Sequence, residues 1–396
     1  MDAQATAPFL RHFRDLRDPR RHNVRHVFTD ILTIAILAVL CKADDWDEVV
    51  VWAAARVAWL RTILTLPNGV PSVDTFARVF ARVDPAAFER CFMAWTASLA
   101  KALGGAGATA GATAGATAGA TAGGVVALDG KTLRGSFAHA WDRQTIHLVS
   151  AFAADHQLLL GQLAVADKSN EITAIPKLLE LLSIEGATVT IDAMGCQREI
   201  AATIRAKGAH YVLSVKDNQP TLHDKVRALL DEAILDRFDG MSHGHHESTD
   251  GGHGRVETRR VWVTDEVKWL GADLLALWPD LASVAVVEST RDVAGKGTSV
   301  ERRYFISSHG GVDAAAIGHA IRAHWGVENG VHWHLDVTFG EDASRLHKDH
   351  GAENFSRLRR LSLNLLKRAP GKGSLKGKRF RCSLDEAYLL QVLQSQ

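Results

Sequence analysis

The sequence predicts an α/β fold: a mixed sheet with helices on its faces, a helical N-terminal domain before it and a β-rich insertion within it. Apolar residues recur at helical spacing through the first 103 positions, whereas short strand-like runs alternate with helical segments from residue 125 onward. Between 221 and 310 strand-like runs prevail, which indicates the insertion. A chain of 396 residues, 46% of them hydrophobic, is too long for one core, so several domains are expected.

Residues 1–103 are predicted to form a helical domain associated with DNA binding. Its most apolar run, ILTIAILAVLC at 31–41, is shorter than the ~20 residues of a membrane-spanning helix and therefore indicates a buried core helix. The break at 84–85 separates two helices, which fits either a helix-turn-helix that reads DNA or an ordinary helical hairpin. The GATA repeats of 104–124 contain no large apolar side chain, which is typical of a flexible linker.

Residues 125–220 and 311–368 are predicted to form a single core. Its strands and helices are expected, in order, at VVALDG (125–130), TIHLVSAFAA (145–154), LLLGQLAVA (158–166), EITAIPKLLELLSI (171–184), ATVTIDA (187–193), REIAATIRAKG (198–208) and YVLSVK (211–216). In this order the first and fourth strands are neighbours in a mixed sheet. Helical spacing returns at 313–337 and again at 352–368.

The β-rich insertion is predicted at 221–310. A helix at 222–234 is followed by a polar loop rich in His and Gly at 242–254 and by three strand-like runs, RVETRRVWVTD, SVAVVESTRD and SVERRYFISS. The histidines of the loop could bind a transition metal, although a solvated loop is the simpler interpretation. The last segment, 369–396, is predicted to be a basic C-terminal tail.

Two aspartates stand at the ends of neighbouring strands. Asp129 ends the first strand, in LDGKTLRGS, and Asp192 ends the fourth, in TIDAMG. Strand ends of open α/β sheets face the crevice where ligands bind, so the two carboxylates are expected to approach one another. Each aspartate alone could also be a turn or helix-cap residue. A third acid on the returning helix, Glu328, would complete a cage of oxygen ligands suited to Mg²⁺.

The stretch HWGVENGVHWHLDVTFGED, residues 324–342, is dense in residues that can bind metals. It could be a zinc site, a catalytic acid on a helix or a solvated helix face. The zinc interpretation is set aside because the partners that Glu328 needs are aspartates on two distant strands. Trp325 and Trp333 are expected to be packing residues, with stacking on an extruded DNA base as the alternative. The neighbours predicted to support Glu328 are His324, Asn329 and His332.

Five segments resemble, in order, the bacterial insertion-sequence transposases of the DDE type, in the subgroup that includes the H-repeat-associated proteins. They are DGKTLRGS, KSNEITAIPKLLELL, TIDAMGCQ, YVLSVKDNQPTL and RAHWGVENGVHWHLDVTFGEDASR. The resemblance covers nearly the whole chain apart from the GATA linker. It implies a ribonuclease-H-like, retroviral-integrase-like catalytic core whose triad is Asp129, Asp192 and Glu328.

The resemblance also implies a reaction, a cofactor and partners. The reaction is metal-dependent cleavage at the insertion-sequence ends, followed by strand transfer into target DNA, with Mg²⁺ or Mn²⁺ bound as two ions. The partners are the terminal inverted repeats and the target DNA, bound by a homodimer or a larger assembly. Four scattered cysteines and the lack of a secretory signal are typical of the cytoplasm, where the protein is expected at the nucleoid and not at a membrane.

The sequence departs from the wider transposase group at one signature. That group often carries Tyr, Arg, Glu and Lys on the catalytic helix, with Arg four positions before Glu and Lys seven after it. The corresponding slots here hold Ile321, His324 and Leu335, and Arg322 is displaced from the Arg slot. The phosphate-clamping role of the signature therefore does not carry over directly.

The formal net charge is only +1, so DNA affinity must come from local clusters of basic residues. A basic cluster is expected in the C-terminal region, where a solvated helix face is the alternative. The residues predicted to contact DNA are Lys131, Arg134, Lys216, Arg322, Arg345, Lys348, Arg357, Arg359 and Arg360.

Two other functions fit the same residues. A catalytically silent descendant would bind DNA for regulation, and a nuclease would cut DNA through the triad without strand transfer. The intact set of three acids favours the active transposase over the silent descendant.

Overall fold

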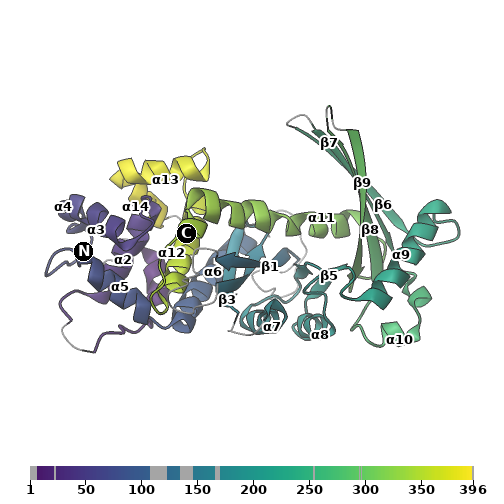
Figure 1. The fold of residues 1–396 in the computed structure, drawn as a ribbon, viewed down its shortest axis with the longest axis horizontal. Coiled ribbons are helices and arrows are strands. Elements are labelled where there is room, and N and C mark those ends of the chain that lie inside the picture. Colours follow the sequence, from purple (N-terminus) through teal and green to yellow (C-terminus); the bar gives the residue numbers. More distant parts are fainter. Residues whose placement is uncertain are drawn as a thin grey trace.

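The computed structural model describes residues 7–21, 24–107, 123–133, 146–165, 170–252, 255–293, 295 and 297–394. Helices gather at one end of the molecule, a sheet occupies its centre, and long strands project at the other end (Figure 1). The sheet has nine strands in the order β3-β2-β1-β4-β5-β9-β8-β7-β6. A mixed α/β fold is therefore confirmed. Most of the predicted GATA linker lies outside the described residues.

The N-terminal region is helical, as predicted. Its elements are η1 (Pro8–Phe13), α2 (Phe28–Leu40), α3 (Trp46–Ala55), α4 (Val57–Leu60), α5 (Val73–Arg82) and α6 (Pro85–Gly107). Helix α2 is buried on all sides, from Asp30 through Leu40, which confirms a core helix in the apolar run. α5 and α6 meet at 83–84, and a DNA-reading role for this pair stays a prediction. Among the described residues no helix is both long and apolar enough to cross a bilayer.

The centre of the sheet follows the predicted order of strands and helices. It consists of β1 (Val125–Leu133), β2 (Ile146–Ala153), β3 (Leu158–Ala164), α7 (Glu171–Leu181), β4 (Thr188–Ile191), α8 (Arg198–Ala206) and β5 (His210–Val215). Strands β1, β2 and β3 form an antiparallel meander, while β1, β4 and β5 run parallel. Ile191, the last residue of β4, pairs with Leu128 of β1, so Asp192 and Asp129 follow at neighbouring positions, as the sequence predicted. The predicted end of the first strand at 130 is wrong, because β1 continues to Leu133 along β2.

The strands of the insertion continue the central sheet. The region contains α9 (Pro220–Leu235), β6 (Gly244–Gly252), β7 (Arg255–Thr264), η4 (Val267–Leu270), α10 (Ala272–Leu275), β8 (Ser283–Val293) and β9 (Gly297–Ser307). Strand β9 pairs antiparallel with β5, which joins the insertion to the core. The prediction of a loop at 242–254 is wrong, because β6 pairs along its whole length with β7. Since β6 is exposed on both faces, its sequence lacks the apolar alternation that reveals a strand.

The chain then returns across the sheet to the helical end. α11 (Ala314–His324) is followed by two π-helical turns, η5 (Glu328–His332) and η6 (His334–Thr338), and by η7 (Glu341–Ala343), α12 (Gly351–Arg368), α13 (Leu375–Leu384) and α14 (Glu386–Gln394). The helical spacing predicted at 313–337 is thus divided into α11 and two wider turns. The predicted tail, 369–396, contains two helices, with α13 against α2 and α14 against η1.

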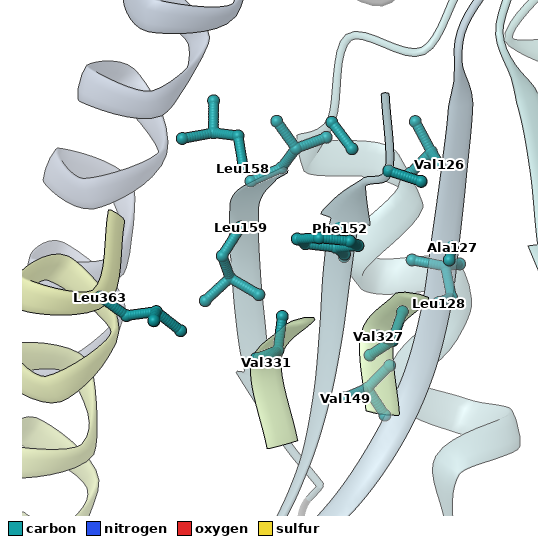
Figure 2. Close-up of a cluster of buried hydrophobic side chains, with 14 of the residues drawn as sticks. Val126, Ala127, Leu128, Val149, Phe152, Leu158, Leu159, Val327, Val331 and Leu363 are labelled. Atoms are coloured by element: carbon teal, nitrogen blue, oxygen red, sulfur yellow. The ribbon is translucent and has the colours of Figure 1, made fainter. Parts of the chain in front are cut away.

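The sheet and the returning chain share one apolar core (Figure 2). Val327 and Val331, both fully buried, lie over the strands beside Leu128, Val149 and Phe152 (Figure 2). These two valines flank Glu328 in the sequence. Their burial fixes the first π-helical turn against the sheet and so determines where Glu328 lies.

Candidate active site

The structure brings the three predicted acids into one cavity. Asp129 lies within β1, Asp192 directly follows β4, and Glu328 begins η5. All three line a cavity of about 440 Å³ over the ends of the parallel strands. Asp129 accepts a hydrogen bond from the amide of Gly130 at 2.9 Å, and Asp192 accepts one from the amide of Gly195 at 3.2 Å.

The tightest group of potential ligands joins two of these acids to a histidine. Ligand atoms of Asp129, Glu328 and His332 all lie within 4.8 Å of one another. His332 Nδ1 is 3.4 Å from Asp129 Oδ2 and 3.7 Å from Glu328 Oε2. Asp192 is not a member of this group but lines the same cavity. The predicted supporting role of His332 thus has a geometric basis.

The electrostatic setting of Asp129 suits a bound cation. The pKa of Asp129 is raised to about 7, first by burial and then by the negative charges of Asp192, Glu171 and Glu328, while the hydrogen bond from Gly130 opposes the rise. Among the described residues no Lys or Arg pairs with Asp129. Oxygen donors crowded in this way suit Mg²⁺ or Mn²⁺, which prefer carboxylates and would relieve the repulsion.

Glu171 is a fourth acid that the sequence did not single out. It is the first residue of α7, and a Cβ atom on Gly130 would lie 2.0 Å from Glu171 Oε1, so its carboxylate rests directly on the glycine backbone. Burial raises the pKa of Glu171, and Asp192 raises it further. Glu171 belongs to KSNEITAIP, part of a segment that resembles the transposases. It was not singled out, because a glutamate in the first turn of a helix is common for reasons of helix stability alone.

His332 is enclosed beside the acids. Burial, together with the positive charges of Lys131 and Arg360, lowers its pKa to about 3, so the imidazole is neutral. Its Nε2 atom is buried without a hydrogen-bond partner among the described residues.

Lys131 was predicted to contact phosphates, and the structure corrects this. Its side chain is only 8% exposed and is paired with Asp336 and, at 3.2 Å, with Glu341. The amino group is therefore committed to buried carboxylates. The sequence showed only that Lys131 follows Asp129, and both carboxylates come from a segment about two hundred residues away.

The predicted DNA contacts of three arginines on α12 are also wrong. Arg357, Arg359 and Arg360 are 2%, 1% and 0% exposed. Arg357 pairs with Glu89 at 2.8 Å, and Arg360 pairs with Glu341 at 2.6 Å. The guanidinium of Arg359 stacks on the ring of Phe355, 4.5 Å from its centroid. Because α12 runs between the N-terminal helices and β3, its charges meet protein and not solvent.

Four of the predicted DNA contacts are exposed, and their role stays a prediction. Lys216 lines the cavity of the acids, and Arg322 on α11 pairs with Asp250 at 2.9 Å. Arg345 and Lys348 are exposed in the segment before α12. Arg134 lies outside the described residues.

Two of the predicted supporting residues differ in their surroundings. His324 is half-buried, and its Nδ1 lies 3.3 Å from the hydroxyl of Thr190 on β4. Asn329 is exposed beside Glu328. The supporting roles of both stay predictions.

A second and larger cavity opens beside the first. It has a volume of about 830 Å³, lies among β6 to β9 and α11, and also includes Glu328 and Trp325 in its lining. Trp325 is 48% exposed and lies under the guanidinium of Arg303, 4.7 Å from its ring centroid. The expectation that Trp325 and Trp333 are packing residues is wrong, since Trp333 is also 50% exposed.

Comparison with known proteins decides the family. The model of the Transposase DDE domain matches residues 121–365, and the model described as DDE_Tnp_1-associated matches residues 10–96. The chain belongs to the transposase DDE family. The matched domain spans the central sheet, its insertion and most of α12, and so contains the three acids of the cavity.

Relatives of this DDE family member extend over its whole length. The "Putative transposase YncI" of Escherichia coli O157:H7 is 37% identical over 100% of this chain and 96% of its own. The "H repeat-associated putative transposase YhhI" of Escherichia coli strain K12 is 34% identical over 97% of each chain. The predicted resemblance is thereby confirmed. A piggyBac transposase synaptic complex with hairpin DNA is a looser structural match, with a TM-score of 0.41 and 12% identity over 98% of this chain and 77% of that chain.

Proposed function

We propose that this DDE family member cleaves DNA at the ends of its insertion sequence and joins those ends to target DNA, with Asp129, Asp192 and Glu328 as the catalytic acids. The observation that carries the proposal is their convergence in one cavity, at the point where β4 ends beside the parallel strand β1. The core is proposed to be ribonuclease-H-like. Membership in the family supports DNA as the substrate.

The acids would hold two divalent cations, Mg²⁺ or Mn²⁺. Such ions, when bound, help to activate the attacking oxygen and to stabilise the leaving oxygen of a phosphoryl transfer. The protein itself positions the reacting groups: β1 and β4 hold two carboxylates, and η5 holds the third against the sheet. Lys216, exposed in the lining of the same cavity, is proposed to bind a DNA phosphate.

The terminal inverted repeats and the target DNA are the proposed partners. Because two ends must be cut and joined together, the active form is proposed to be a homodimer or larger on DNA, working at the nucleoid. Sedimentation of the protein with and without a terminal-repeat duplex measures this directly.

The activity is tested with purified protein, its own terminal repeats and Mg²⁺ or Mn²⁺. Asp129→Asn, Asp192→Asn and Glu328→Gln are each expected to lower the rate of strand cleavage by about 10³-fold or more, since each removes a charge from the cation site. Asp74→Asn, an exposed change on α5, serves as the matched control and is expected to keep full activity. Equal cleavage by wild type and Asp129→Asn would reject the proposal.

Measuring nicked and joined products separately distinguishes the alternatives. A nuclease would give nicks without joined products, and a silent descendant would bind the repeats without either product. Joined products from the wild type alone are the result expected of the transposase.

A further inference from the structure

The side chain of His332 is buried beside two of the three acids, Asp129 and Glu328. It is 6% exposed, and Nδ1 faces Asp129 Oδ2 at 3.4 Å and Glu328 Oε2 at 3.7 Å. Both separations exceed the distance of about 2.9 Å that is typical of an N–H···O hydrogen bond. Nε2 has no hydrogen-bond partner among the described residues. Among the described residues, the carboxylates of Asp129 and Glu328 are the acidic groups that lie within 4 Å of a nitrogen of this ring.

These separations are close to those of ligands that share an ion. Two donors at about 2.1 Å from one cation lie about 3.0 Å apart at right angles and about 3.4 Å apart at a tetrahedral angle. His332 Nδ1 and Asp129 Oδ2 are already separated by the 3.4 Å expected at a tetrahedral angle. The pair formed by His332 and Glu328 is wider by a few tenths of an ångström, and the exposed Glu328 side chain can move by that amount.

The backbone holds the ring in this position. Glu328 and His332 are the first and last residues of the π-helical turn η5, and buried Val331 anchors that turn to the sheet (Figure 2). Single π-helical turns recur at functional sites because they change the direction of side chains within a helix. The wider turn presents both side chains to the carboxylate of Asp129.

The other histidines of this stretch do not share these features. His324 lines the cavity of the three acids, but its Nδ1 lies 3.3 Å from the hydroxyl of Thr190. His334 Nδ1 lies 3.3 Å from the hydroxyl of Thr338. Neither ring belongs to the group of potential metal ligands found among the described residues.

We propose that His332 is a direct metal ligand, binding a divalent cation through Nδ1 together with Asp129 and Glu328. The proposal rests on the function proposed above and gives one of its two ion positions a mixed nitrogen and oxygen donor set. Imidazole suits later transition metals better than it suits Mg²⁺, whereas carboxylates suit Mg²⁺ and Mn²⁺. This position is therefore expected to bind Mn²⁺ more tightly than Mg²⁺.

The test is spectroscopic and needs neither DNA nor turnover. Mn²⁺ is bound to the untagged full-length protein, and pulsed electron paramagnetic resonance records hyperfine coupling between the ion and nitrogen. Wild type is expected to show a histidine nitrogen coupling that changes when the protein contains isotopically labelled histidine. Because the labelled protein has the wild-type sequence, this measurement does not depend on any variant folding.

Two variants identify the histidine. His332→Ala is expected to abolish the coupling and to weaken Mn²⁺ binding, measured by calorimetry, by about 10-fold or more. His324→Ala is the matched control, since it changes a histidine of the same cavity, and it is expected to keep the coupling. Coupling that persists in His332→Ala would overturn the proposal.

A further outcome separates this inference from the proposed function. If Mn²⁺ binds to the wild type without nitrogen coupling, and Asp129→Asn abolishes that binding, the carboxylate site stands and His332 is not a ligand. In that case His332 is only a buried neighbour of Asp129 and Glu328. If Mn²⁺ does not bind at all, both the inference and the metal-dependent function fail.

Discussion

At the scale of single residues, the buried carboxyl group of Asp129 makes the free energy of unfolding depend on pH. Its pKa of about 7 in the folded state compares with about 3.9 for an aspartate in an unfolded chain. At a pH between these two values, Asp129 is ionised in the unfolded state but still protonated in the folded state. Stability therefore falls as the pH rises from about 4 to about 7 and then levels off.

Asp129→Asn removes this dependence. In the absence of divalent metal, we expect the variant to be more stable than wild type by about 1–3 kcal/mol at pH 8 and by clearly less at pH 5. Urea denaturation with a chelator present, at both pH values, measures the difference. Adding Mg²⁺ at pH 8 is expected to stabilise the wild type but not the variant.

The exposed change Asp74→Asn is the control for this measurement. Its side chain is 76% exposed, so it is expected to shift stability equally at both pH values. An equal gain from Asp129→Asn at pH 5 and pH 8 would contradict the elevated pKa.

The sequence predicted those site residues whose position follows from strand order. Asp129 and Asp192 each end an apolar run, and strand order alone places them together. Glu171 and His332 could not be assigned to the site in this way. The position of Glu171 depends on the absence of a Cβ at Gly130, and that of His332 depends on a π-helical turn, which helical spacing at 3.6 residues per turn does not reveal.

At the scale of elements, α12 is a charged helix with a buried environment. Arg360 and Lys131 both reach Glu341, which is 2% exposed. Burial alone would raise the pKa of Glu341, but Arg360 and Lys131 hold it at about 2, so the carboxylate stays ionised. The many arginines of α12 led to the prediction of an exposed, DNA-binding helix. The sequence does not show that Glu341 on η7 neutralises Arg360, because tertiary packing alone brings η7 beside α12.

Glu341→Gln is expected to destabilise the protein by about 3–5 kcal/mol, since it leaves Arg360 buried without its carboxylate. Asp74→Asn breaks an exposed ion pair with Arg78 and is expected to cost less than about 0.5 kcal/mol. Denaturant titration of both variants compares the two sites. If Glu341→Gln lowers the free energy of unfolding by less than about 1 kcal/mol, the guanidinium of Arg360 is accessible to solvent, and Arg360 is again a candidate DNA contact.

The elements that the sequence placed poorly share one cause. β6 is exposed on both faces, and α13 carries four basic residues and buries only Arg379 and Cys382, so neither shows the periodic apolar pattern from which core elements are recognised. Each is held by pairing or packing with a partner distant in the sequence. Elements with a clear apolar pattern, such as the fully buried β4 and α8 with its one buried face, were predicted to within a few residues.

At the scale of the whole molecule, the two ends of the chain form one helical body. Helices α12, α13 and α14 lie with α2, α3 and α5 at the same end (Figure 1). α12 packs on α2, α5 and α6, and α13 packs on α2. The predicted domain of residues 1–103 is therefore only part of this body, and the rest comes from beyond the sheet.

This arrangement predicts that residues 1–103 do not fold alone. Without α12 and α13, the apolar side chains of α2 that are buried all round would face water, at about 1.5–3 kcal/mol for each large side chain exposed. We expect a fragment of residues 1–103 to bind a hydrophobic dye, to associate in sedimentation and to melt without a cooperative transition. The matched control joins residues 1–103 to residues 351–394 through a flexible linker and is expected to be monomeric and to melt cooperatively. A monomeric fragment with a sharp thermal transition would instead show that the N-terminal helices form a domain of their own.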